Sequence, residues 1–516
     1  MLAISHACAV IGIEGILVEV QVDFNPKAGI PSFSIVGLPD SAVRESRERV
    51  RAAIRNSGLR FPNKGYVVNL SPADLPKHST AYDLAIAIGV LAATDQIPLH
   101  TLEKTLYIGE LSLDGRIRHV KGTMAMAYAA KEQGFKAMYV ASEDAAQASL
   151  IDGITVYSVE TLGQLNEHLY QLNEIPPFDR TTITINTQRQ NQNYTDFADV
   201  KGQQHVKRAL EVAAAGGHNV RLVGPPGTGK SLLSHALRSI LPTMTTEEAL
   251  EVTRIYSVAD MLLADEPFIQ TRPFQNPHHT ASSAGLIGGG TIPKPGSASL
   301  SHRGILFLDE ANEFPSRILE SLRQPIEDKQ ITISRAKQTL TFPANFMLVL
   351  AHNPCPCGFY GDLNKACSCT PNQIKRYQSK LSGPLLDRID IHVEVPRVEY
   401  SELMEEARAE ASEIVQKRVE RARQKQNERY RKLNNIFANG DLGAGEIQDY
   451  CVLTEESKQL LTLSVRRLQL SARSYHRVLK LSRTIADLSE SNMIEVPHLA
   501  EALQYRPKDQ SQDGYR

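Results

Sequence analysis

The chain has 516 residues, of which 42% are apolar, and its formal net charge at pH 7 is −1. This composition allows large buried cores in roughly three domains and excludes a wholly disordered chain. The neutral balance also excludes nucleic-acid binding through a global basic field, so any such binding depends on local patches.

The amino-terminal stretch lacks the features of a signal peptide. No cluster of Lys and Arg leads it, and Glu14 and Glu19 interrupt its apolar residues. No later stretch is long and apolar enough to span a bilayer. We therefore expect a cytoplasmic protein with no membrane partner.

Residues 1–175 are predicted to form one domain that mixes strands and helices. Apolar residues alternate along 15–24, as they do in a half-buried strand. A helix is expected next, with Ser41 as its N-cap and Gly58 as its stop signal. Further strand and helix patterns follow to the end of this domain.

Residues 176–196 are predicted to be a linker, because they are polar and lack a helical stripe. Strand and helix patterns then alternate through 197–397, which is typical of a wound parallel sheet covered by helices. Residues 398–516 are helical in pattern almost throughout. The predicted fold class is therefore α/β, with a helical carboxyl-terminal domain.

A phosphate-binding loop is the clearest motif in 197–397. Residues 224–231 read GPPGTGKS, between an apolar run that ends at Val223 and a helical pattern that begins at Lys230. Glycines in such a loop let backbone N–H groups surround phosphate oxygens at a helix amino terminus. Lys230 is expected to reach the outer phosphates of ATP, and Ser231 to bind Mg²⁺. The predicted loop consists of Gly224, Pro225, Pro226, Gly227, Thr228, Gly229, Lys230 and Ser231.

Two carboxylates follow the next buried strand pattern. The apolar residues Ile305 to Leu308 lead directly into Asp309 and Glu310. A carboxylate at a strand end opposite a phosphate-binding loop suits Mg²⁺, which assigns Asp309 to the metal. Its neighbour Glu310 is placed to polarise the attacking water. A solvated acidic turn is the alternative, which the nearby loop makes the weaker interpretation.

Three further positions give the chain a resemblance to the AAA+ superfamily. Asn353 ends another apolar strand pattern and matches sensor 1, while Arg388 in LLDRID matches the arginine finger. Arg473 in LSARSYHR matches sensor 2 of the group that contains MCM helicases and magnesium chelatases. The resemblance implies catalytic roles for these residues in ATP sites shared between subunits of a ring, usually of six.

Two segments resemble inserts of the same group. The Gly- and Pro-rich residues 272–304 resemble an insert in helix 2, and their adjacent His278 and His279 suit loop packing or DNA contact better than a metal. Alternation on both sides of SRAK predicts a β-hairpin that resembles the presensor 1 hairpin. This implies that Arg335 and Lys337 face the ring pore and bind DNA phosphates. An ordinary surface hairpin is the alternative.

A basic stretch lies in the helical domain. Residues 416–435 contain eight Lys or Arg, and Glu420 and Glu428 are their only acids. We favour a solvated helix face over a DNA-binding helix, because most basic runs on helices are solvated.

Four of the six cysteines fall in one short loop, with C-x-C at each end and nine residues between the two pairs. Four thiolates suit a tetrahedral zinc site, and a reducing cytosol disfavours disulfides. A redox pair more often has the spacing C-x-x-C. We favour structural zinc over inert reduced thiols and redox chemistry, with these ligands: Cys355, Cys357, Cys367 and Cys369.

The first domain resembles the proteolytic domain of Lon, through PKHSTAYDLAIAIGVLAA and YIGELSLDGRIRHVKGTMAMAYAAKEQGFKAMYV. The resemblance implies a Lon-protease-like α+β fold. Ala81 and Met124 stand where Lon has its catalytic serine and lysine, and neither is a nucleophile or a base. We therefore expect a domain without the catalytic dyad.

The whole arrangement resembles the bacterial ComM/YifB family, which is magnesium-chelatase-like. It consists of a Lon-like domain, an AAA+ P-loop module with these inserts and the NPCPCG…CSCT loop, and a helical lid. The resemblance implies a hexameric ATPase with ATP, Mg²⁺ and structural Zn²⁺. It also implies a branch-migration helicase that acts on single-stranded and branched DNA in recombination during natural transformation. The alternatives are a chelatase-type ATPase and a protein-remodelling ATPase.

Overall fold

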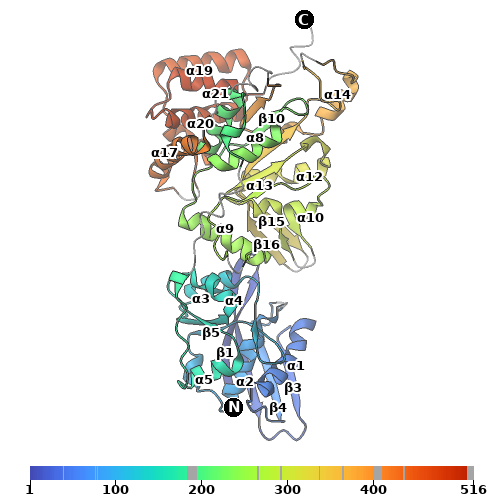
Figure 1. Ribbon diagram of the computed structural model, residues 1–516, viewed down its shortest axis with the longest axis vertical. Coiled ribbons are helices and arrows are strands. Elements are labelled where there is room, and N and C mark those ends of the chain that lie inside the picture. Colours follow the sequence, from blue (N-terminus) through green and yellow to red (C-terminus); the bar gives the residue numbers. More distant parts are fainter. Residues whose placement is uncertain are drawn as a thin grey trace. The chain divides into compact units, whose positions relative to one another are not determined.

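The computed structural model describes the chain apart from residues 39, 76, 78, 183–194, 264–265, 291–292, 336–337, 363–364, 399–409, 434–435 and 508–516. The chain divides into two compact units (Figure 1). The first unit combines Met1–Asn186 with two later segments, Thr246–Ile269 and Ser334–Thr341, and the second contains the other residues. The division at residues 175, 196 and 397 stays a prediction. No helix of the described part is long and apolar enough to cross a membrane.

A seven-stranded mixed sheet forms the first unit, in the order β3-β4-β2-β1-β5-β8-β9. Its strands are β1 (Leu2–Ile11), β2 (Glu14–Asn25), β3 (Ser32–Val36), β4 (Gly65–Ser71), β5 (Thr105–Tyr107), β8 (Ala137–Ala141) and β9 (Thr155–Val159). The pairs β1–β2 and β2–β4 are antiparallel, and the other pairs are parallel. The strand predicted over 15–24 is confirmed as part of β2, where Val18, Val20 and Val22 are fully buried.

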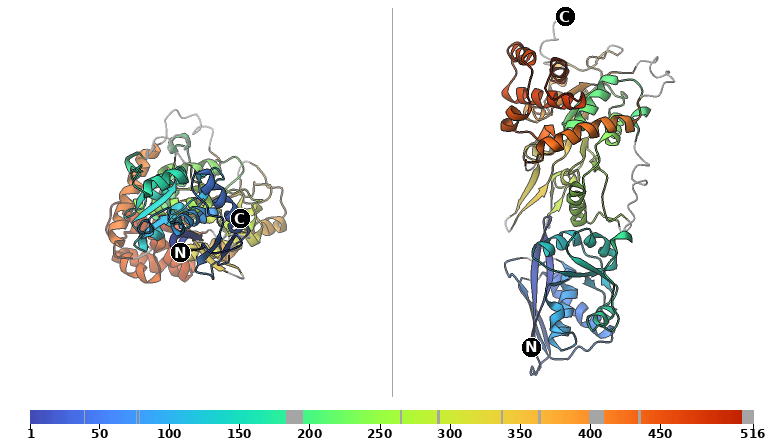
Figure 2. Two further views of the ribbon diagram at one scale, coloured as in Figure 1. Left: turned by 90° about the horizontal axis from the view of Figure 1, so that it is seen from below. Right: turned by 90° about the vertical axis from the view of Figure 1, so that its left-hand side faces the viewer.

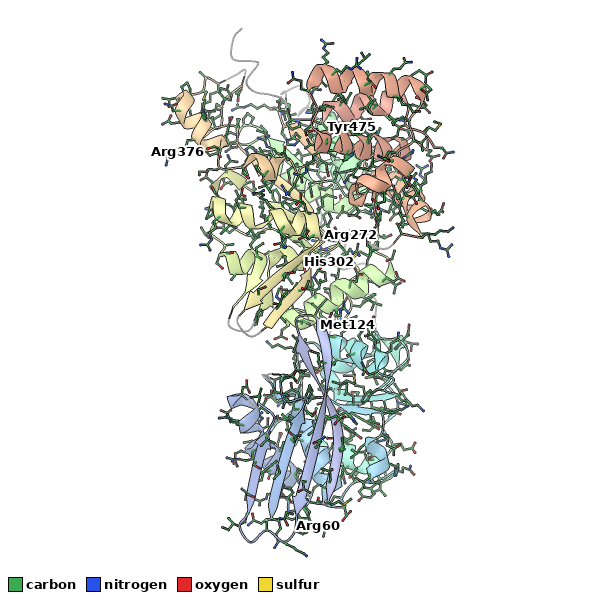
Figure 3. The ribbon with its side chains drawn as sticks, turned by 180° about the vertical axis from the view of Figure 1, so that it is seen from behind. Arg60, Met124, Arg272, His302, Arg376 and Tyr475 are labelled. Carbon is green, nitrogen blue, oxygen red and sulfur yellow. The ribbon has the colours of Figure 1, made fainter. Side chains whose placement is uncertain are left out.

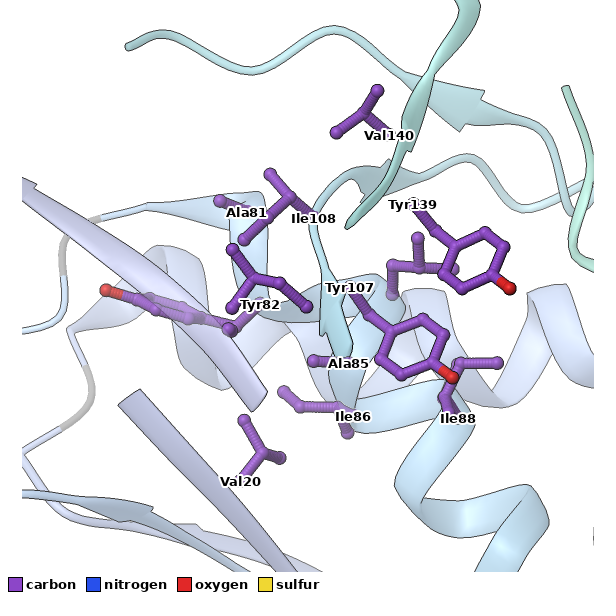
Figure 4. Packing of buried hydrophobic residues seen from close by; sticks show 14 of the residues in the cluster. Val20, Ala81, Tyr82, Ala85, Ile86, Ile88, Tyr107, Ile108, Tyr139 and Val140 are labelled. Atoms are coloured by element: carbon purple, nitrogen blue, oxygen red, sulfur yellow. The ribbon is translucent and has the colours of Figure 1, made fainter. Parts of the chain in front are cut away.

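Helices pack on this sheet, and the unit also contains a short hairpin. The helices are α1 (Ser41–Asn56), α2 (Asp83–Ala93), α3 (Thr123–Glu132), α4 (Ser142–Ser149) and α5 (Leu162–Leu169), and α9 (Thr246–Ala259), from later in the chain, packs against α3. The hairpin pairs β6 (Glu110–Leu111) with β7 (Ile117–Arg118). Every residue of α2 is buried, and Ile86 and Ile88 pack near Val20 and Tyr107 (Figure 4). This apolar helix against the sheet forms the core of the unit.

The start of α1 corrects one prediction. Asp40, not Ser41, is the N-cap, and its carboxylate accepts a hydrogen bond from the backbone N–H of Val43 at 2.9 Å. A carboxylate caps as well as a hydroxyl does and also interacts favourably with the positive end of the helix dipole. The predicted stop is confirmed, since Gly58 follows the helix end with a φ of 76°.

A five-stranded, all-parallel sheet forms the centre of the second unit, in the order β11-β14-β17-β10-β18. Its strands are β10 (Val220–Val223), β11 (Phe274–Gln275), β14 (Ile305–Leu308), β17 (Met347–His352) and β18 (Ile391–Glu394). All residues of β14 and β17 are buried, which explains why these strands are continuous apolar runs in the sequence. The predicted wound parallel sheet is confirmed.

Helices alternate with the strands of this sheet along the chain, and the carboxyl-terminal helices form a further group (orange to red in Figures 1 and 2). The alternating helices are α7 (Gln204–Gly216), α8 (Lys230–Leu237), α10 (Ser283–Ile287), α11 (Ser297–Leu300), α12 (Ser316–Ser321), α13 (Arg323–Asp328), α14 (Pro371–Gln378) and α15 (Gly383–Leu386). The group comprises α17 (Ser412–Tyr430), α18 (Ala444–Tyr450), α19 (Glu455–Leu468), α20 (Ala472–Leu488) and α21 (Val496–Gln504). This confirms the helical carboxyl-terminal region; Arg376 on α14 and Tyr475 on α20 locate the two groups in Figure 3.

Two small hairpins lie in the predicted inserts. The glycine run of the first insert follows α10 and pairs β12 (Gly288–Gly289) with β13 (Lys294–Pro295). The predicted second hairpin is confirmed as β15 (Gln330–Arg335) and β16 (Gln338–Pro343). Lys337 and the side chain of Arg335, the proposed DNA contacts, lie outside the described residues.

Candidate nucleotide site and metal centre

The loop between β10 and α8 has a backbone that only glycine adopts without strain. Gly227 and Gly229 have φ values of 77° and 82°. A Cβ atom at Gly224 would lie 2.2 Å from the carbonyl oxygen of Val395, too close for any side chain. The loop therefore leads directly into the amino terminus of α8 at Lys230, where backbone N–H groups and the helix dipole favour an anion.

Lys230 is buried within this loop. Its Nζ donates to the carbonyl oxygens of Gly224 at 2.8 Å and Pro225 at 2.7 Å, and to Oδ1 of Asn353 at 3.2 Å. Burial lowers the pKa of Lys230, although the nearby carboxylates of Asp309 and Glu310 act in the opposite direction. The ammonium group thus has only neutral acceptors, and a phosphate would offer it a full opposing charge.

Ser231 and Asp309 come from different elements and meet beside Lys230. The hydroxyl of Ser231 donates to Oδ2 of Asp309 at 2.6 Å. The second carboxylate oxygen of Asp309 accepts the backbone N–H of Glu310 at 2.9 Å, which fixes the plane of the carboxylate. A hydroxyl oxygen and a carboxylate oxygen are hard ligands of the kind Mg²⁺ prefers, so this pair fits the ion.

Glu310 has the backbone and exposure of a reactive group. Its φ of 49° lies in the left-handed region, which is uncommon for a residue with a side chain. Its carboxylate is 63% exposed and lies 3.7 Å from Nδ1 of His279. From the sequence, His279 was expected in loop packing or DNA contact, and its approach to Glu310 was not predicted. No spacing signal links the two residues, because they lie in separate segments.

His352 fixes the position of Asn353. Burial lowers the pKa of His352 to about 3, so the imidazole is neutral. Its Nε2 lies 2.9 Å from Nε of Arg221, which donates, and its Nδ1 donates to the carbonyl oxygen of Asn353 at 2.7 Å. The sequence analysis missed His352 and Arg221. Together they hold the backbone of the residue whose amide reaches Lys230.

Arg388 and Arg473 meet on one carboxylate. Oε2 of Glu327, on α13, lies 2.7 Å from Nη2 of Arg388. Oε1 of the same carboxylate lies 2.5 Å from Nη2 of Arg473. Among the described residues, no hydrogen bond or ion pair joins either arginine to Lys230, Ser231 or Asp309. Within one chain, the structure therefore brings the two predicted arginines to each other and not to the phosphate-binding loop.

A pocket of about 490 Å³ lies beside the phosphate-binding loop. This volume is in the range of sites for small ligands. Gln203 bridges two of its walls, because its Nε2 donates to the carbonyl oxygens of Thr228 at 2.9 Å and Pro396 at 3.0 Å. The lining comprises Asp199, Val200, Lys201, Gln203, Pro226, Gly227, Thr228, Gly229, Leu232, Arg397 and Val398. A nucleotide with its phosphates on the loop has space here for its base and sugar.

The four cysteines of the predicted metal site come together. Their Sγ atoms all lie within 4.8 Å of one another, and the three pairs among Cys355, Cys357 and Cys367 are 3.3 to 3.7 Å apart. All four are free thiols. Tetrahedral zinc with Zn–S bonds of ~2.3 Å places sulfurs about 3.8 Å apart. The donor set and its spacing therefore fit zinc.

Backbone groups surround these sulfurs. The N–H groups of Tyr360, Cys357 and Cys369 point at sulfur atoms at 3.3 to 3.4 Å. A backbone hydrogen bond from Phe359 is the main cause that lowers the pKa of Cys357 to about 5. At Cys367 a backbone hydrogen bond from Cys369 favours the thiolate, yet burial and the adjacent thiols raise its pKa to about 12. The sulfurs cannot all ionise together without a cation between them.

The basic stretch over 416–435 is mostly engaged within the protein. Arg418 contacts Glu211 at 2.6 Å, Arg421 contacts Glu490 at 2.9 Å, and Arg429 contacts the buried Asp487 at 2.5 Å. One face of α17 is also buried, through Val415, Val419, Ala422, Gln426 and Tyr430. The solvated face that the sequence favoured is present in part: the side chains of Lys417 and Arg421 are 66% and 62% exposed, while carboxylates on other elements pair with Arg418 and Arg429.

The positions that align with the Lon dyad lie in the core of the first unit. Ala81 is fully buried beside Ile108 (Figure 4), and Met124 on α3 (Figure 3) is 1% exposed. The nearby Ser79 accepts a hydrogen bond from the backbone N–H of Ala81 at 3.1 Å as the cap of a short helix. Neither aligned position offers a reactive group.

Family models match three parts of the chain. Residues 196–403 match "Magnesium chelatase, subunit ChlI", residues 18–144 match "Subunit ChlI of Mg-chelatase", and residues 409–506 match the ChlI carboxyl-terminal domain. These matches agree with the parallel sheet and the helical region of the second unit.

Relatives are similar over almost the full length. Competence protein ComM of Haemophilus influenzae is 42% identical over 506 residues, which cover 98% of this chain and 97% of that protein. YifB of Salmonella typhimurium is 42% identical over 513 residues, with the same coverage. Lon protease 2 of Bacillus subtilis is 26% identical over 172 residues, 30% of each chain, which gives the Lon-like prediction partial support. The chain belongs to the ComM/YifB family of magnesium-chelatase-like AAA+ proteins.

Proposed function

We propose that this protein is an ATPase that uses ATP hydrolysis to drive a DNA motor. The observation that carries the ATPase proposal is the convergence of Lys230, Ser231, Asp309 and Asn353 at the carboxyl ends of three adjacent parallel strands. Ligands of open α/β sheets bind at this edge. Loss of ATP binding in Lys230→Ala tests this part of the proposal.

Each residue of this site has a defined task. Lys230 exchanges its carbonyl acceptors for the outer phosphates of ATP, and Ser231 and Asp309 hold Mg²⁺, which neutralises phosphate charge. Glu310 orients and polarises the attacking water, and Asn353 contributes a polar contact beside Lys230. His279 lies next to Glu310 and keeps the Glu310 carboxylate near the phosphate-binding loop.

We propose a ring, expected to be a hexamer, in which the arginines act across the subunit interface. Arg388 and Arg473 share Glu327 and have no described contact with the loop residues of their own chain. An arginine acts in trans when it places its charge on the γ-phosphate held by a neighbour. A head-to-tail interface that closes on itself allows every site to receive such residues.

The proposed substrate is single-stranded and branched DNA. The name of the ComM relative places that protein in competence, and the similarity spans nearly both chains. We propose branch migration in recombination during natural transformation, with Arg335 and Lys337 as phosphate contacts. DNA should then stimulate ATP turnover, and this stimulation should weaken as salt rises, because phosphate contacts release counterions. An Arg335→Ala, Lys337→Ala double variant should lose the stimulation and retain basal turnover.

A chelatase-type ATPase is the second candidate, favoured by the match of residues 196–403 to a magnesium chelatase subunit. Such an ATPase would drive metal insertion into a porphyrin through a partner protein. The response to DNA distinguishes the two functions, because DNA should not change the ATP turnover of a chelatase-type enzyme.

We also propose that the cysteine loop holds structural zinc and that the first unit has no peptidase activity. Elemental analysis of protein purified without chelator should find about one zinc per chain, as the four-ligand set predicts. Pure enzyme with ATP should leave an unfolded protein substrate intact, because Ala81 and Met124 carry no nucleophile or base.

A further inference from the structure

The cysteine loop lies against the phosphate-binding loop. Gly358, between the two cysteine pairs, has a φ of 86°, and a Cβ atom there would be 2.5 Å from Cδ of Pro226. Pro226 belongs to the phosphate-binding loop and lines the nucleotide pocket. Because a proline ring cannot move aside as the end of a flexible side chain can, the two loops fit together only with glycine at this position.

A second contact joins the cysteine loop to another wall of the same pocket. The side chain of Asp362 is 3% exposed, and its Oδ2 lies 3.0 Å from Nε of Arg397. The guanidinium of Arg397 also lies 5.5 Å from the ring centroid of Phe359, on whose ring Lys365 packs at 4.1 Å. Arg397 lines the pocket, so a buried carboxylate and an aromatic ring of the cysteine loop determine where this cation lies.

Backbone hydrogen bonds connect the residues that make these contacts to Cys355 and its neighbours. Gly358 donates its backbone N–H to the carbonyl oxygen of Cys355 at 3.0 Å, and Tyr360 donates its own to Sγ of Cys355 at 3.3 Å. Asp362 donates its backbone N–H to the carbonyl oxygen of Phe359 at 3.1 Å. Groups next to metal ligands fix the orientation of those ligands, and the ligands fix them in return.

We propose that the metal-holding cysteine loop clamps the nucleotide pocket, through Gly358 on Pro226 and Asp362 on Arg397, so that nucleotide affinity depends on the bound metal. This inference rests on the proposed nucleotide binding and assigns Arg397 as a residue that contacts the nucleotide. Without the cation the four sulfurs lose their shared bonding partner and cannot all remain ionised, so loss of the metal loosens the loop. The loosened loop releases both walls of the pocket.

The loop contains its own matched control. Gly361 has a φ of 80°, close to that of Gly358, but no heavy atom lies within 4 Å of a Cβ built there. Gly358→Ala and Gly361→Ala therefore carry similar backbone strain, and only the first pushes on Pro226. Asp362→Asn removes the charge that holds Arg397 without touching a cysteine, and Glu490→Gln removes the exposed partner of Arg421 as its control.

The experiment measures zinc content and the affinity for ATP with Mg²⁺ in the full chain, by elemental analysis and calorimetric titration. With zinc bound, Gly358→Ala and Asp362→Asn should each weaken ATP binding about tenfold, which corresponds to ~1.4 kcal/mol. Gly361→Ala and Glu490→Gln should change it less than about twofold on the same scale. Chelator treatment of the wild type should weaken binding at least as much as Gly358→Ala, and added zinc should restore it.

Several results would overturn the clamp. One is equal affinity in Gly358→Ala and Gly361→Ala, and another is unchanged ATP affinity after zinc is removed. If Gly358→Ala does not fold, wild-type affinity in zinc-loaded Asp362→Asn decides against the clamp in its place. If the zinc-loaded wild type binds no ATP at all, the proposed ATPase function fails as well, which separates the two hypotheses.

Discussion

In the proposed mechanism, Glu310 is the residue on which ATP hydrolysis depends most. Its left-handed backbone turns the side chain away from the buried strand β14, and the carboxylate is exposed beside His279. Glu310→Gln keeps the shape but cannot accept a proton, so ATP affinity should be retained while turnover falls by about 10²- to 10⁴-fold. Titration with ATP and steady-state phosphate release measure the two quantities.

Glu313→Gln is the matched control for this variant. Glu313 lies in the next turn, is 44% exposed, pairs with Lys380 at 3.5 Å and hydrogen-bonds the side chain of Tyr377. Its loss should leave turnover within about twofold, since exposed ion pairs contribute little. Turnover in Glu310→Gln equal to that of Glu313→Gln would remove Glu310 from the chemistry.

The site residues that the sequence predicts are those that belong to a pattern of neighbouring residues. The glycines around Lys230 and the apolar strand before Asp309 form patterns within a few positions, and the strand–loop–helix context that they predict is present. Their catalytic roles stay predictions. Glu327 and Arg397 have no such pattern, because their partners lie far away in the sequence and only the fold brings them near.

The packing partner of helix α9 also could not be predicted from the sequence. The sequence of α9 lies inside the region predicted as the AAA+ module, yet the helix belongs to the first unit and packs against α3. Its end is joined to that unit by polar contacts: the carbonyl oxygen of Ser257 accepts from Gly122 N–H at 3.2 Å, and Asp260 contacts Lys121 at 2.6 Å. Helical periodicity predicts that a helix forms but not which surface it contacts.

His119 makes this attachment dependent on pH. It lies between Asp144, at 2.5 Å, and Asp260, at 3.1 Å, with Lys121 also on Asp260. The hydrogen bond to Asp144 is the main cause that raises the pKa of His119 to about 9. The unfolded value is about 6.5, so protonated His119 stabilises the folded unit fully below that pH, and the stabilisation is lost as pH rises through about 9. The part of this stabilisation that holds α9 comes from the contact with Asp260.

Hydrogen exchange of the α9 amides measures this effect. After correction for intrinsic exchange rates, protection of α9 in the wild type should decrease between pH 7 and pH 10. In His119→Gln, which carries no charge at either pH, protection should be lower at pH 7 and should change less. Equal pH dependence in the two proteins would show that another group controls the attachment.

Helix α17 shows the limits of an inference from charge alone. Eight basic residues in 416–435 suggested a solvated surface, with DNA binding as the alternative. Carboxylates from α7 and α20 instead pair with Arg418 and Arg429. Charge runs in a sequence do not show which partners lie across an interface, so this feature required the structure.

The proposed ring requires subunits that complete one another's sites. Lys230→Ala removes the loop cation, and Arg388→Ala removes the residue proposed to act on the neighbour. Each variant alone should be nearly inactive as an ATPase. In a one-to-one mixture, about a quarter of the interfaces of a closed head-to-tail ring pair an intact loop with an intact arginine.

Phosphate release from the mixture measures this complementation. Activity should rise with mixing to a maximum near equal amounts, after time for subunits to exchange. Lys230→Ala mixed with Glu310→Gln is the control, because both lesions lie on the same side of the interface and no pairing restores a site. Failure of the Arg388→Ala mixture to exceed this control would place Arg388 in the site of its own chain.

The most direct test of the central claim is ATP-dependent movement of a labelled Holliday junction by the pure protein. The wild type should migrate the branch with ATP and Mg²⁺. It should bind the junction without moving it when given an ATP analogue that cannot be hydrolysed, and Glu310→Gln should behave in the same way with ATP. If the wild type hydrolyses ATP but neither moves the junction nor turns over faster with DNA, the protein is not a DNA motor.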